Sequence, residues 1–204
     1  MTETQWHPID LPDATLGYAP DFLSREEAHN IFDILAAEIP WHQDRITLFG
    51  RQIALPRLQA WYGDPGTDYR YSGLTLAPLP WTPTLSHLRR RVEAACRCRF
   101  NSVLINYYRD GNDSVGWHRD DEAELGPRPR IASLTLGQPR PFQLRHRTRK
   151  ELRHQLMLTE GSLLLMAGAT QHCWLHALPK SRRALGPRIN LSFRYRLPDP
   201  VRDS

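Results

Sequence analysis

The sequence predicts an α+β fold in which two amphipathic helices precede a sheet sandwich or barrel. The first indication is a capping box, Ser24 with Glu27 in "SREE", which opens a helix expected to reach about Ala37. The second is the Pro-rich stretch "PLPWTP" at 78–83, which introduces another helix. The third is the change, from residue 103 on, to short runs punctuated by Gly and Pro. Helices followed by closely spaced strands are typical of α+β folds.

Each expected helix has one apolar stripe at helical spacing. The stripe of the first helix is Ala28, Ile31, Phe32 and Leu35, and that of the second is Leu85, Leu88, Val92 and Ala95. The expected strands are 103–108, 131–137, 141–145, 156–159, 162–167 and 188–196. Their number and short spacing favour two packed sheets that hold the functional site.

Length and composition indicate one intracellular domain. A chain of 204 residues can bury one sizeable core and is short for two. Its longest apolar run, 163–168, is far below the roughly 18 residues of a membrane span, and the N-terminus has no secretory signal. Three cysteines, Cys96, Cys98 and Cys173, are too few for a disulfide scaffold, which favours a reducing compartment. Cys96 and Cys98 could be half of a zinc site, but no second pair completes it, so we expect small fillers near a helix end.

The charge is unevenly distributed along the chain. The first 40 residues carry a net charge of −7, and the remaining 164 carry +12. The positive charge gathers at 89–91, 145–154 and 180–183. A basic body favours a polyanionic partner, most commonly nucleic acid, although solvated loops explain such charge equally well.

The stretch "SVGWHRDDE" contains a candidate metal site. In a strand, His118 and Asp120 share one face because residues two apart point the same way. Downstream, His172 or His176 in "QHCWLHALP" can supply a third ligand, and spacing does not choose between them. Two histidines and one carboxylate form the facial triad of non-heme Fe(II) oxygenases.

The expected last strand has one apolar and one polar face. Ile189, Leu191, Phe193 and Tyr195 form the apolar face, which we expect to pack. Polar residues alternate with them: Arg188, Asn190, Ser192 and Arg194. The two arginines lie about 20 Å apart along a strand, so their side chains can reach inward to both ends of a short dicarboxylate. Asn106 and Tyr108 in "INYY" can add neutral hydrogen bonds to the same ligand.

Together, "LINYYRDGNDSVGWHRDDE" and "HALPKSRRALGPRINLSFR" resemble the AlkB family of Fe(II)- and 2-oxoglutarate-dependent nucleic-acid dioxygenases, most closely its branch acting on duplex DNA. The resemblance extends from about Tyr18 to Arg196 and depends on His-x-Asp, a distant His and Arg-x-Asn-x-x-x-Arg, in that order. It implies a double-stranded β-helix, or jelly roll, with buttressing N-terminal helices and a substrate-binding hairpin lid. It also implies one dioxygenase domain over 1–204, with helices and nucleotide-recognition hairpins at 11–100 and the catalytic core at 101–196.

The resemblance implies which residues bind iron. His118, Asp120 and His176 would hold the Fe(II) ion, because the family places its third ligand immediately before an "LP" segment followed by a basic loop. That position selects His176 over His172.

It also implies which residues bind 2-oxoglutarate. Arg188 would take the far carboxylate together with Tyr108 and Asn190. Arg194, which belongs to the catalytic set, would lie with Asn106 near the carboxylate that chelates iron.

A base to be demethylated must leave the duplex or be single-stranded already. The segment "DYRYSG" supplies Tyr69, Tyr71 and Ser72, and the resemblance places Tyr71 opposite the His118 ring with the base between them. Glu122 would be the acid near the base. Without the resemblance, strand packing would explain both tyrosines.

The stretch "TLFGRQIALPR" at 47–57 resembles the hairpin by which duplex-acting members insert an aromatic residue into the base stack. Phe49 would be that residue, with Arg57 on the returning arm; packing of Phe49 in the core is the alternative. A basic run would hold the opposite strand through its phosphates: Lys180, Arg182 and Arg183. Ser181 departs from the basic run of that branch.

The implied function is repair of DNA by oxidative demethylation of 1-methyladenine and 3-methylcytosine, with release of formaldehyde and restoration of the base. Fe(II) is the implied cofactor, and 2-oxoglutarate and O2 are the cosubstrates. We expect an intracellular monomer, cytoplasmic or, in a eukaryote, nuclear, that acts on duplex or single-stranded DNA, with RNA as a further candidate. The alternatives are a dioxygenase acting on RNA or protein, a nucleic-acid-binding relative without catalysis, and a zinc hydrolase.

Overall fold

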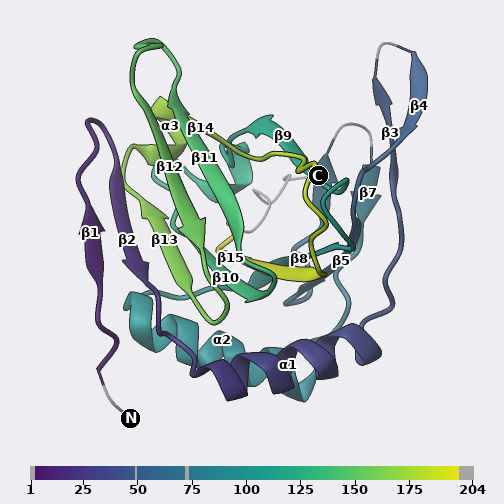
Figure 1. Ribbon diagram of the computed structural model, residues 1–204. Coiled ribbons are helices and arrows are strands. Elements are labelled where there is room, and N and C mark those ends of the chain that lie inside the picture. The colour runs from purple at the N-terminus through teal and green to yellow at the C-terminus, as the bar shows by residue number, and fades with distance from the viewer. Residues whose placement is uncertain (1–2, 49, 72–73, 198–204) are drawn as a thin grey trace, which may run out of the picture.

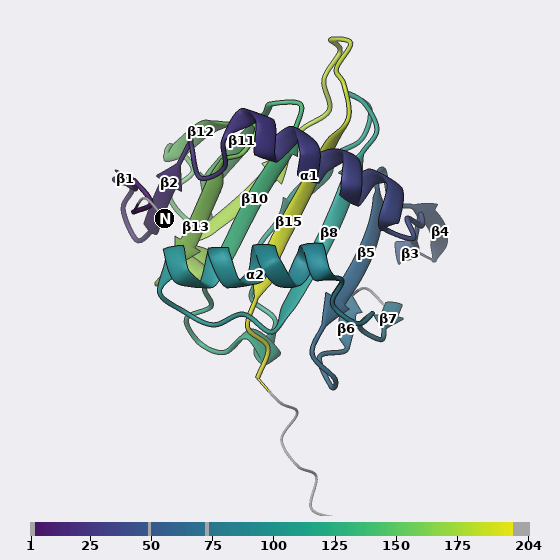
Figure 2. The ribbon, with the colours of Figure 1, turned by 90° about the horizontal axis from the view of Figure 1, so that it is seen from below.

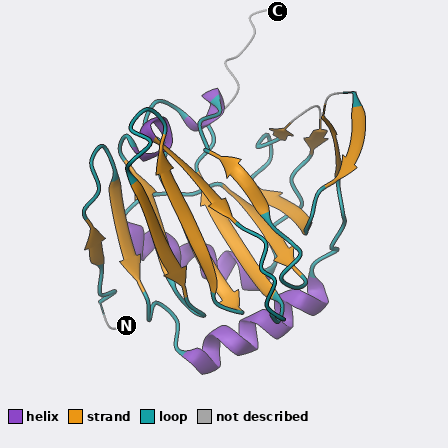
Figure 3. Ribbon diagram, turned by 45° about the horizontal axis from the view of Figure 1, so that its top comes forward, coloured by secondary structure: helices purple, strands orange, loops and turns teal. Residues whose placement is uncertain are grey.

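The computed structural model describes residues 3–48, 50–71 and 74–197, and two antiparallel sheets lie at its centre (Figure 1). The larger sheet has seven strands in the spatial order β1 (His7–Ile9), β2 (Thr15–Ala19), β13 (Leu163–Ala167), β10 (Ile131–Gly137), β15 (Arg188–Arg194), β8 (Ser102–Tyr108) and β5 (Leu58–Gly63). The smaller sheet has four strands in the order β12 (Arg153–Leu158), β11 (Arg140–His146), β14 (Trp174–Leu178) and β9 (Val115–His118). Figure 3 shows the strands of both sheets in one view.

Apolar side chains from both sheets fill the space between them. Phe142 and Leu144 of β11 and Trp174 of β14 belong to the same buried cluster as Leu164 and Met166 of β13. Burial of this apolar surface holds the sheets together and sets their inner faces opposite each other. The expected sheet sandwich is therefore present, and it is consistent with the jelly roll that the resemblance implies.

Two helices, α1 (Arg25–Glu38) and α2 (Pro83–Cys96), cross the outer face of the larger sheet (Figure 2). They pack against it through side chains that share one cluster with β8, β10 and β15: Ala28, Ile31, Leu35, Leu85, Leu88 and Val92. The expected apolar stripes are these buried faces, with Cys96 buried at the end of the second one. No helix within the described ranges is long and apolar enough to span a membrane.

Both helices begin at a side-chain cap. The Ser24 hydroxyl accepts a hydrogen bond from the Glu27 backbone N–H at 3.2 Å, and Thr82 does the same for Leu85 at 3.2 Å. The Glu27 carboxylate does not complete the expected capping box, because it pairs with Arg91 of α2 instead. This ion pair joins the two helices across the sheet face.

Two hairpins and two short helical segments complete the chain. The hairpins are β3 (Arg45–Leu48) with β4 (Arg51–Ala54), and β6 (Tyr69–Tyr71) with β7 (Leu74–Leu76). The short helical segments are η1 (Ala123–Leu125) and α3 (Thr170–Cys173). The first hairpin extends away from the two sheets (Figure 1). Phe49, the residue expected at its tip, lies outside the described residues.

The structure departs from the expected strands in two respects. Strands β1, β2, β5 and β14 were not predicted, because their sequences show no clear alternation. The last strand ends at Arg194, so Tyr195 does not join the apolar face and is 46% exposed. The face formed by Ile189, Leu191 and Phe193 is fully buried against the helices, as the alternation predicted.

Candidate active site

Three side chains converge on the inner face of the smaller sheet. His118 ends β9 and pairs in register with His176 of β14, and their ring centroids lie 4.2 Å apart. Asp120 follows two residues beyond the strand, and its Oδ2 is 3.8 Å from His176 Nε2. One ligand atom from each residue lies within 4.8 Å of the others. The sequence suggested that Asp120 shares a strand face with His118, but Asp120 lies in the loop after β9. This loop turns the Asp120 carboxylate back toward the two histidines.

Neighbouring groups fix the orientation of each candidate ligand. His118 Nδ1 lies 2.8 Å from the Gly116 carbonyl oxygen, so Nδ1 donates a proton there and leaves Nε2 with a lone pair. The Asp120 backbone N–H donates to Gln171 Oε1 at 3.0 Å. Arg194 Nη2 donates to Asp120 Oδ1 at 2.6 Å and thereby connects the smaller sheet to β15.

Electrostatics keep these groups in the protonation states that bind a metal. Burial and then the neighbouring His118 lower the pKa of His176 to about 3, so the imidazole is neutral at physiological pH. Burial also lowers the pKa of His118. Burial opposes ionisation of Asp120, but Arg194 and the two histidines hold its pKa below the usual range. Two neutral imidazoles and one carboxylate are the donor set of a mononuclear Fe(II) site.

His172, the competing third ligand, lies elsewhere. It is exposed on α3, and its Nε2 contacts the Pro127 carbonyl oxygen. The structure therefore brings His176, and not His172, close to His118 and Asp120.

A matched pair of variants tests this choice. We expect His176→Gln to weaken Co(II) or Fe(II) binding by more than about 100-fold, since loss of a supporting residue alone costs about 10–100-fold. His172→Gln should bind the metal as the parent does. Metal titration followed by calorimetry measures both, and equal losses in the two variants would contradict the assignment.

A second group of potential ligands, Asp13, His146 and Cys173, does not fit a metal. His146 Nδ1 accepts hydrogen bonds from the backbone N–H groups of Thr148 and Arg149 at 3.3 and 3.1 Å. Its proton is therefore on Nε2, which faces Asp13 Oδ2 at 3.3 Å. This histidine donates to the carboxylate and has no lone pair to offer there.

A pocket of polar side chains lies on β15 and its neighbours in the larger sheet. Arg188 Nη2 donates to Thr135 Oγ1 of β10 at 2.9 Å and to Asn190 Oδ1 at 2.8 Å. Ser133 donates to the same Asn190 oxygen at 2.9 Å. On the other side, the Arg188 guanidinium lies 5.3 Å from the centre of the Tyr108 ring. Sequence reasoning found Arg188, Asn190 and Tyr108 but missed the hydroxyls, although they occupy alternate positions of an otherwise apolar strand.

Arg188 fits a carboxylate ligand. It is 2% exposed, and among the described residues it has no carboxylate partner and no hydrogen-bond partner for Nε. Burial lowers its pKa to about 10. A buried cation without a counter-ion is costly, so a bound carboxylate such as that of 2-oxoglutarate would supply the missing charge.

Asn106 links this region to Arg57. Arg57 Nε donates to Asn106 Oδ1 at 2.9 Å, and both side chains are buried. The sequence placed Arg57 on the returning arm of the hairpin, which was wrong: β4 ends at Ala54, and Arg57 precedes β5 with its side chain turned inward.

Glu122 lies near the metal cluster and is largely enclosed. Its Oε2 is buried and has no hydrogen-bond partner in the described part of the chain. Burial and the nearby Asp120 raise the pKa of Glu122, although Arg194 and Arg196 oppose this. Arg196, which sequence reasoning missed, is 4% exposed and lies 3.6 Å from Glu124.

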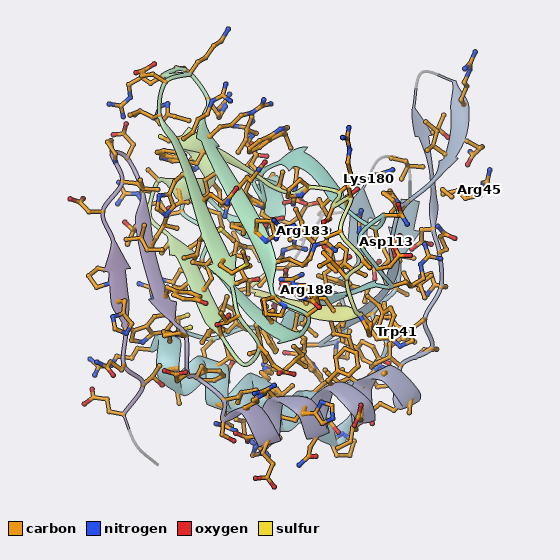
Figure 4. All side chains as sticks on the ribbon, viewed as in Figure 1. Trp41, Arg45, Asp113, Lys180, Arg183 and Arg188 are labelled. Atoms are coloured by element: carbon orange, nitrogen blue, oxygen red, sulfur yellow. The ribbon has the colours of Figure 1, made fainter. Side chains whose placement is uncertain are left out.

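The basic loop between β14 and β15 carries Lys180, Arg182 and Arg183, all exposed. Figure 4 marks Lys180 and Arg183 on this loop and Arg188 in the interior below it. The loop packs closely on Gly111, since a Cβ atom there would lie 2.8 Å from the Ser181 carbonyl oxygen. The backbone N–H of Ser181 also donates to the Gly111 carbonyl oxygen at 2.8 Å.

Arg140 of β11 holds this loop and the loop after β8 in place. It is fully buried and donates to the carbonyl oxygens of Asp110 and Asp113 at 3.0 Å each, and of Pro179 at 2.7 Å. Tyr108 precedes one of these loops, and Arg188 follows the other. No feature of the sequence around Arg140 signals this role.

We expect Arg140→Met to destabilise the fold, because it leaves three carbonyl groups without their donor. A lost partner costs about 1–3 kcal/mol, so urea unfolding should show a loss of at least about 2 kcal/mol. The exposed Arg153→Met on β12 is the matched control and should change stability by less than about 0.5 kcal/mol. Similar losses in both variants would show that Arg140 does not hold the loops.

The remaining expected substrate contacts are only partly within the described structure. Tyr69 and Tyr71 lie on β6, and Ser72 lies outside the described residues. The hairpin that would carry Phe49 holds Arg45, marked in Figure 4. The structure therefore gives the positions of the β-strands of both hairpins. The expected contacts with the base and with the DNA strands remain predictions.

Taken together, the sheet pair and the His-Asp-His cluster define the class of non-heme iron oxygenases. Comparison with known proteins narrows the class. The family model "2OG-Fe(II) oxygenase superfamily" matches residues 15–194. The DNA oxidative demethylase ALKBH2 of Mus musculus is 43% identical over 208 residues, which cover 97% of this chain and 87% of the relative. The alpha-ketoglutarate-dependent dioxygenase alkB homolog 3 of Mus musculus is 42% identical over 190 residues, which cover 89% of this chain and 66% of the relative.

A solved structure titled "The structure of OsALKBH1" has the same fold. It superposes with a TM-score of 0.65 at 14% identity and covers 91% of this chain and 99% of its own. The chain belongs to the AlkB family of the 2OG-Fe(II) oxygenase superfamily, close to the ALKBH2 branch. It is an Fe(II)- and 2-oxoglutarate-dependent dioxygenase, which uses O2 as its second cosubstrate.

Proposed function

We propose that the protein is a DNA repair enzyme that oxidatively demethylates alkylated bases, with 1-methyladenine and 3-methylcytosine as substrates. The observation that carries this proposal is the bond between Arg194 and Asp120. It joins the metal-binding cluster of one sheet to the strand of the facing sheet that carries Arg188. The relatives named DNA oxidative demethylases support the choice of substrate.

His118, Asp120 and His176 would hold the iron, which with 2-oxoglutarate and O2 supplies the oxidation of the methyl group. Arg194 holds the Asp120 carboxylate in its ionised form and in a fixed orientation. The Gly116 carbonyl does the same for the His118 ring. These contacts would hold the ligand atoms in place for the metal before it binds.

Arg188 would bind the far carboxylate of 2-oxoglutarate, with Tyr108 and Asn190 beside it. The Ser133 hydroxyl already donates to the Asn190 oxygen, so this side chain is held in place before the ligand arrives. Asn106, fixed by Arg57, would lie near the carboxylate that chelates iron. These contacts orient the cosubstrate and leave little freedom to be lost on binding.

The alkylated base would enter opposite the His118 ring. Tyr71 would stack on it, and Tyr69 and Ser72 would contact its nucleotide. Glu122 would face the base, because its buried oxygen has no hydrogen-bond partner in the described chain and can accept from an exocyclic amine. The hydroxylated methyl group then leaves as formaldehyde, and the base is restored.

Contacts with the two DNA strands would come from the β3–β4 hairpin and from the loop between β14 and β15. The hairpin of β3 and β4 would act as a lid and direct Phe49 into the base stack. Lys180, Arg182 and Arg183 would hold phosphates, since these exposed cations lie on a loop anchored by Gly111 and Arg140. Such contacts do not read sequence and weaken with salt.

Turnover of an oligonucleotide that carries one 3-methylcytosine tests the proposal. We expect mass spectrometry to show loss of the methyl group from the single-stranded and the paired form, only when Fe(II), 2-oxoglutarate and air are all present. Methyl loss from an RNA oligonucleotide alone would move the substrate to RNA. No methyl loss from any of them, with 2-oxoglutarate still consumed, would refute the nucleic-acid substrate.

The proposal places a monomeric enzyme inside the cell, in the cytoplasm or, in a eukaryote, the nucleus. All three cysteines are free thiols, which suits a reducing compartment. We expect one copy of the chain to be active on its own. Sedimentation velocity on the active enzyme measures this state directly.

A further inference from the structure

Cys96 is the last residue of α2, which crosses the outer face of the larger sheet (Figure 2), and Cys98 follows two residues later. The helix stops because Arg97 adopts a left-handed conformation, with φ of 50° and ψ of 43°. The Cys98 backbone N–H then donates to the Glu93 carbonyl oxygen at 3.3 Å. The reversal leaves a single residue between Cys96 and Cys98 and turns the chain back toward the end of the helix.

The two thiols differ in exposure and charge. Cys96 is 7% exposed and packs in the core under the helices, whereas Cys98 is partly exposed. A hydrogen bond from Cys96, and then Arg130, lower the pKa of Cys98 to about 7 although burial opposes this. The hydrogen bond with Cys98 and burial raise the pKa of Cys96. Cys98 is therefore the more readily ionised of the two thiols, and Cys96 keeps the shared proton.

Cys98 forms part of the wall of an open cavity of about 430 Å³. The lining residues are Arg90, Glu93, Ala94, Arg97, Cys98 and Arg99. The only acid among them already accepts hydrogen bonds from the Phe100 backbone N–H at 2.8 Å and from Arg89 Nε at 3.4 Å. Arg97 pairs with Glu3 at 3.4 Å, so Arg90 and Arg99 are the cations of this wall that could attract a small anion.

We infer that Cys98 and Cys96 form a thiol–disulfide exchange site for a small anionic disulfide of the glutathione class, bound by Arg90 and Arg99. The site lies on the face of the larger sheet opposite the smaller sheet and its iron ligands. Its chemistry is therefore independent of the dioxygenase reaction. An accessible thiolate beside a second thiol is the usual arrangement of a redox-sensitive cysteine.

The exchange proceeds in two balanced steps. The Cys98 thiolate attacks one sulfur of the bound disulfide, so a mixed disulfide forms and one thiolate leaves. Cys96 then gives up its proton and attacks the Cys98 sulfur, which forms the Cys96–Cys98 disulfide and releases the second thiolate. The protein dithiol is oxidised by two electrons, and the small disulfide is reduced to two thiols.

Intact-protein mass spectrometry after incubation with glutathione disulfide tests the site, in a Cys173→Ser background that removes the third thiol. We expect the parent to lose two hydrogens without retaining glutathione, and peptide mapping to join Cys96 to Cys98. Cys96→Ser should retain one glutathionyl group on Cys98. Cys98→Ser should form neither product at a comparable rate, because Cys96 is buried. Thermal unfolding checks that each variant is folded.

Two outcomes would overturn the inference. One is equal reaction of Cys96→Ser and Cys98→Ser, and the other is persistence of both free thiols in the parent. The parent alone decides the second outcome, even if a variant fails to fold. The cavity is tested with Arg90→Gln/Arg99→Gln: we expect the rate with glutathione disulfide to fall at least about 10-fold while the rate with neutral hydroxyethyl disulfide is unchanged. Equal effects on both reagents would exclude a role for the arginines.

Discussion

Asp120→Ala is expected to abolish demethylation and to weaken metal binding by more than about 100-fold, since even supporting residues contribute about 10–100-fold. Asp120 supplies the only carboxylate of the cluster and lies within reach of both histidines. Without it, two neutral imidazoles remain, which are a poor site for a hard divalent ion. Single-turnover demethylation and metal titration measure the two effects.

The adjacent Asp121 provides a matched control. Its carboxylate pairs with Arg119 at 2.6 Å and is not part of the metal cluster. Asp121→Ala removes the same charge from the same loop and should retain metal binding and turnover. If both variants lost activity to the same extent, loop charge rather than ligation would explain the loss.

Arg188→Met is expected to raise the apparent Kd for 2-oxoglutarate by about 30-fold to several thousand-fold, because loss of one partner of a buried charge pair costs about 2–5 kcal/mol. The protein without cosubstrate should not lose stability. Burial lowers the Arg188 pKa to about 10, so below that pH the buried charge opposes folding until a carboxylate pairs with it. Tm with and without 2-oxoglutarate measures both effects.

For the parent we expect 2-oxoglutarate to raise Tm, and for Arg188→Met we expect this increase to vanish. Arg188→Lys should be intermediate, since it keeps the charge but loses the planar fork. Arg153→Met, at an exposed position of β12, should respond to 2-oxoglutarate as the parent does. An undiminished Tm increase in Arg188→Met would place the cosubstrate elsewhere.

The polar face of the last strand could be predicted because polar and apolar residues alternate strictly along it. The pattern in 188–194 predicted that Arg188, Asn190 and Arg194 share one face while Ile189 and Leu191 pack, and the structure has this arrangement. Alternation works here because a strand has a period of two and one face is buried.

The convergence of the metal ligands depended on tertiary structure. Local spacing could not choose between His172 and His176, because only the pairing of β14 with β9 sets His176 opposite His118. Asp120 lies beyond the strand, so the strand argument does not explain how its carboxylate reaches the two histidines.

Long-range anchors were not predictable at all. Arg140 donates hydrogen bonds to backbone carbonyl oxygens of residues 27 to 39 positions away. Every residue has such an oxygen, so the sequence does not indicate which ones Arg140 contacts. The same holds for Gln171, which orients the loop of Asp120 from 51 residues away. Such contacts follow from the packing of the two sheets and not from local pattern.

The measurement that tests the central claim most directly is the ratio of succinate to formaldehyde formed on a 3-methylcytosine oligonucleotide. The site described above couples oxidation of 2-oxoglutarate to loss of the methyl group, so we predict equal amounts of the two products. Both should be absent without Fe(II) and absent in Asp120→Ala. Succinate without formaldehyde on every methylated oligonucleotide, or formaldehyde release that does not need 2-oxoglutarate, would contradict the account.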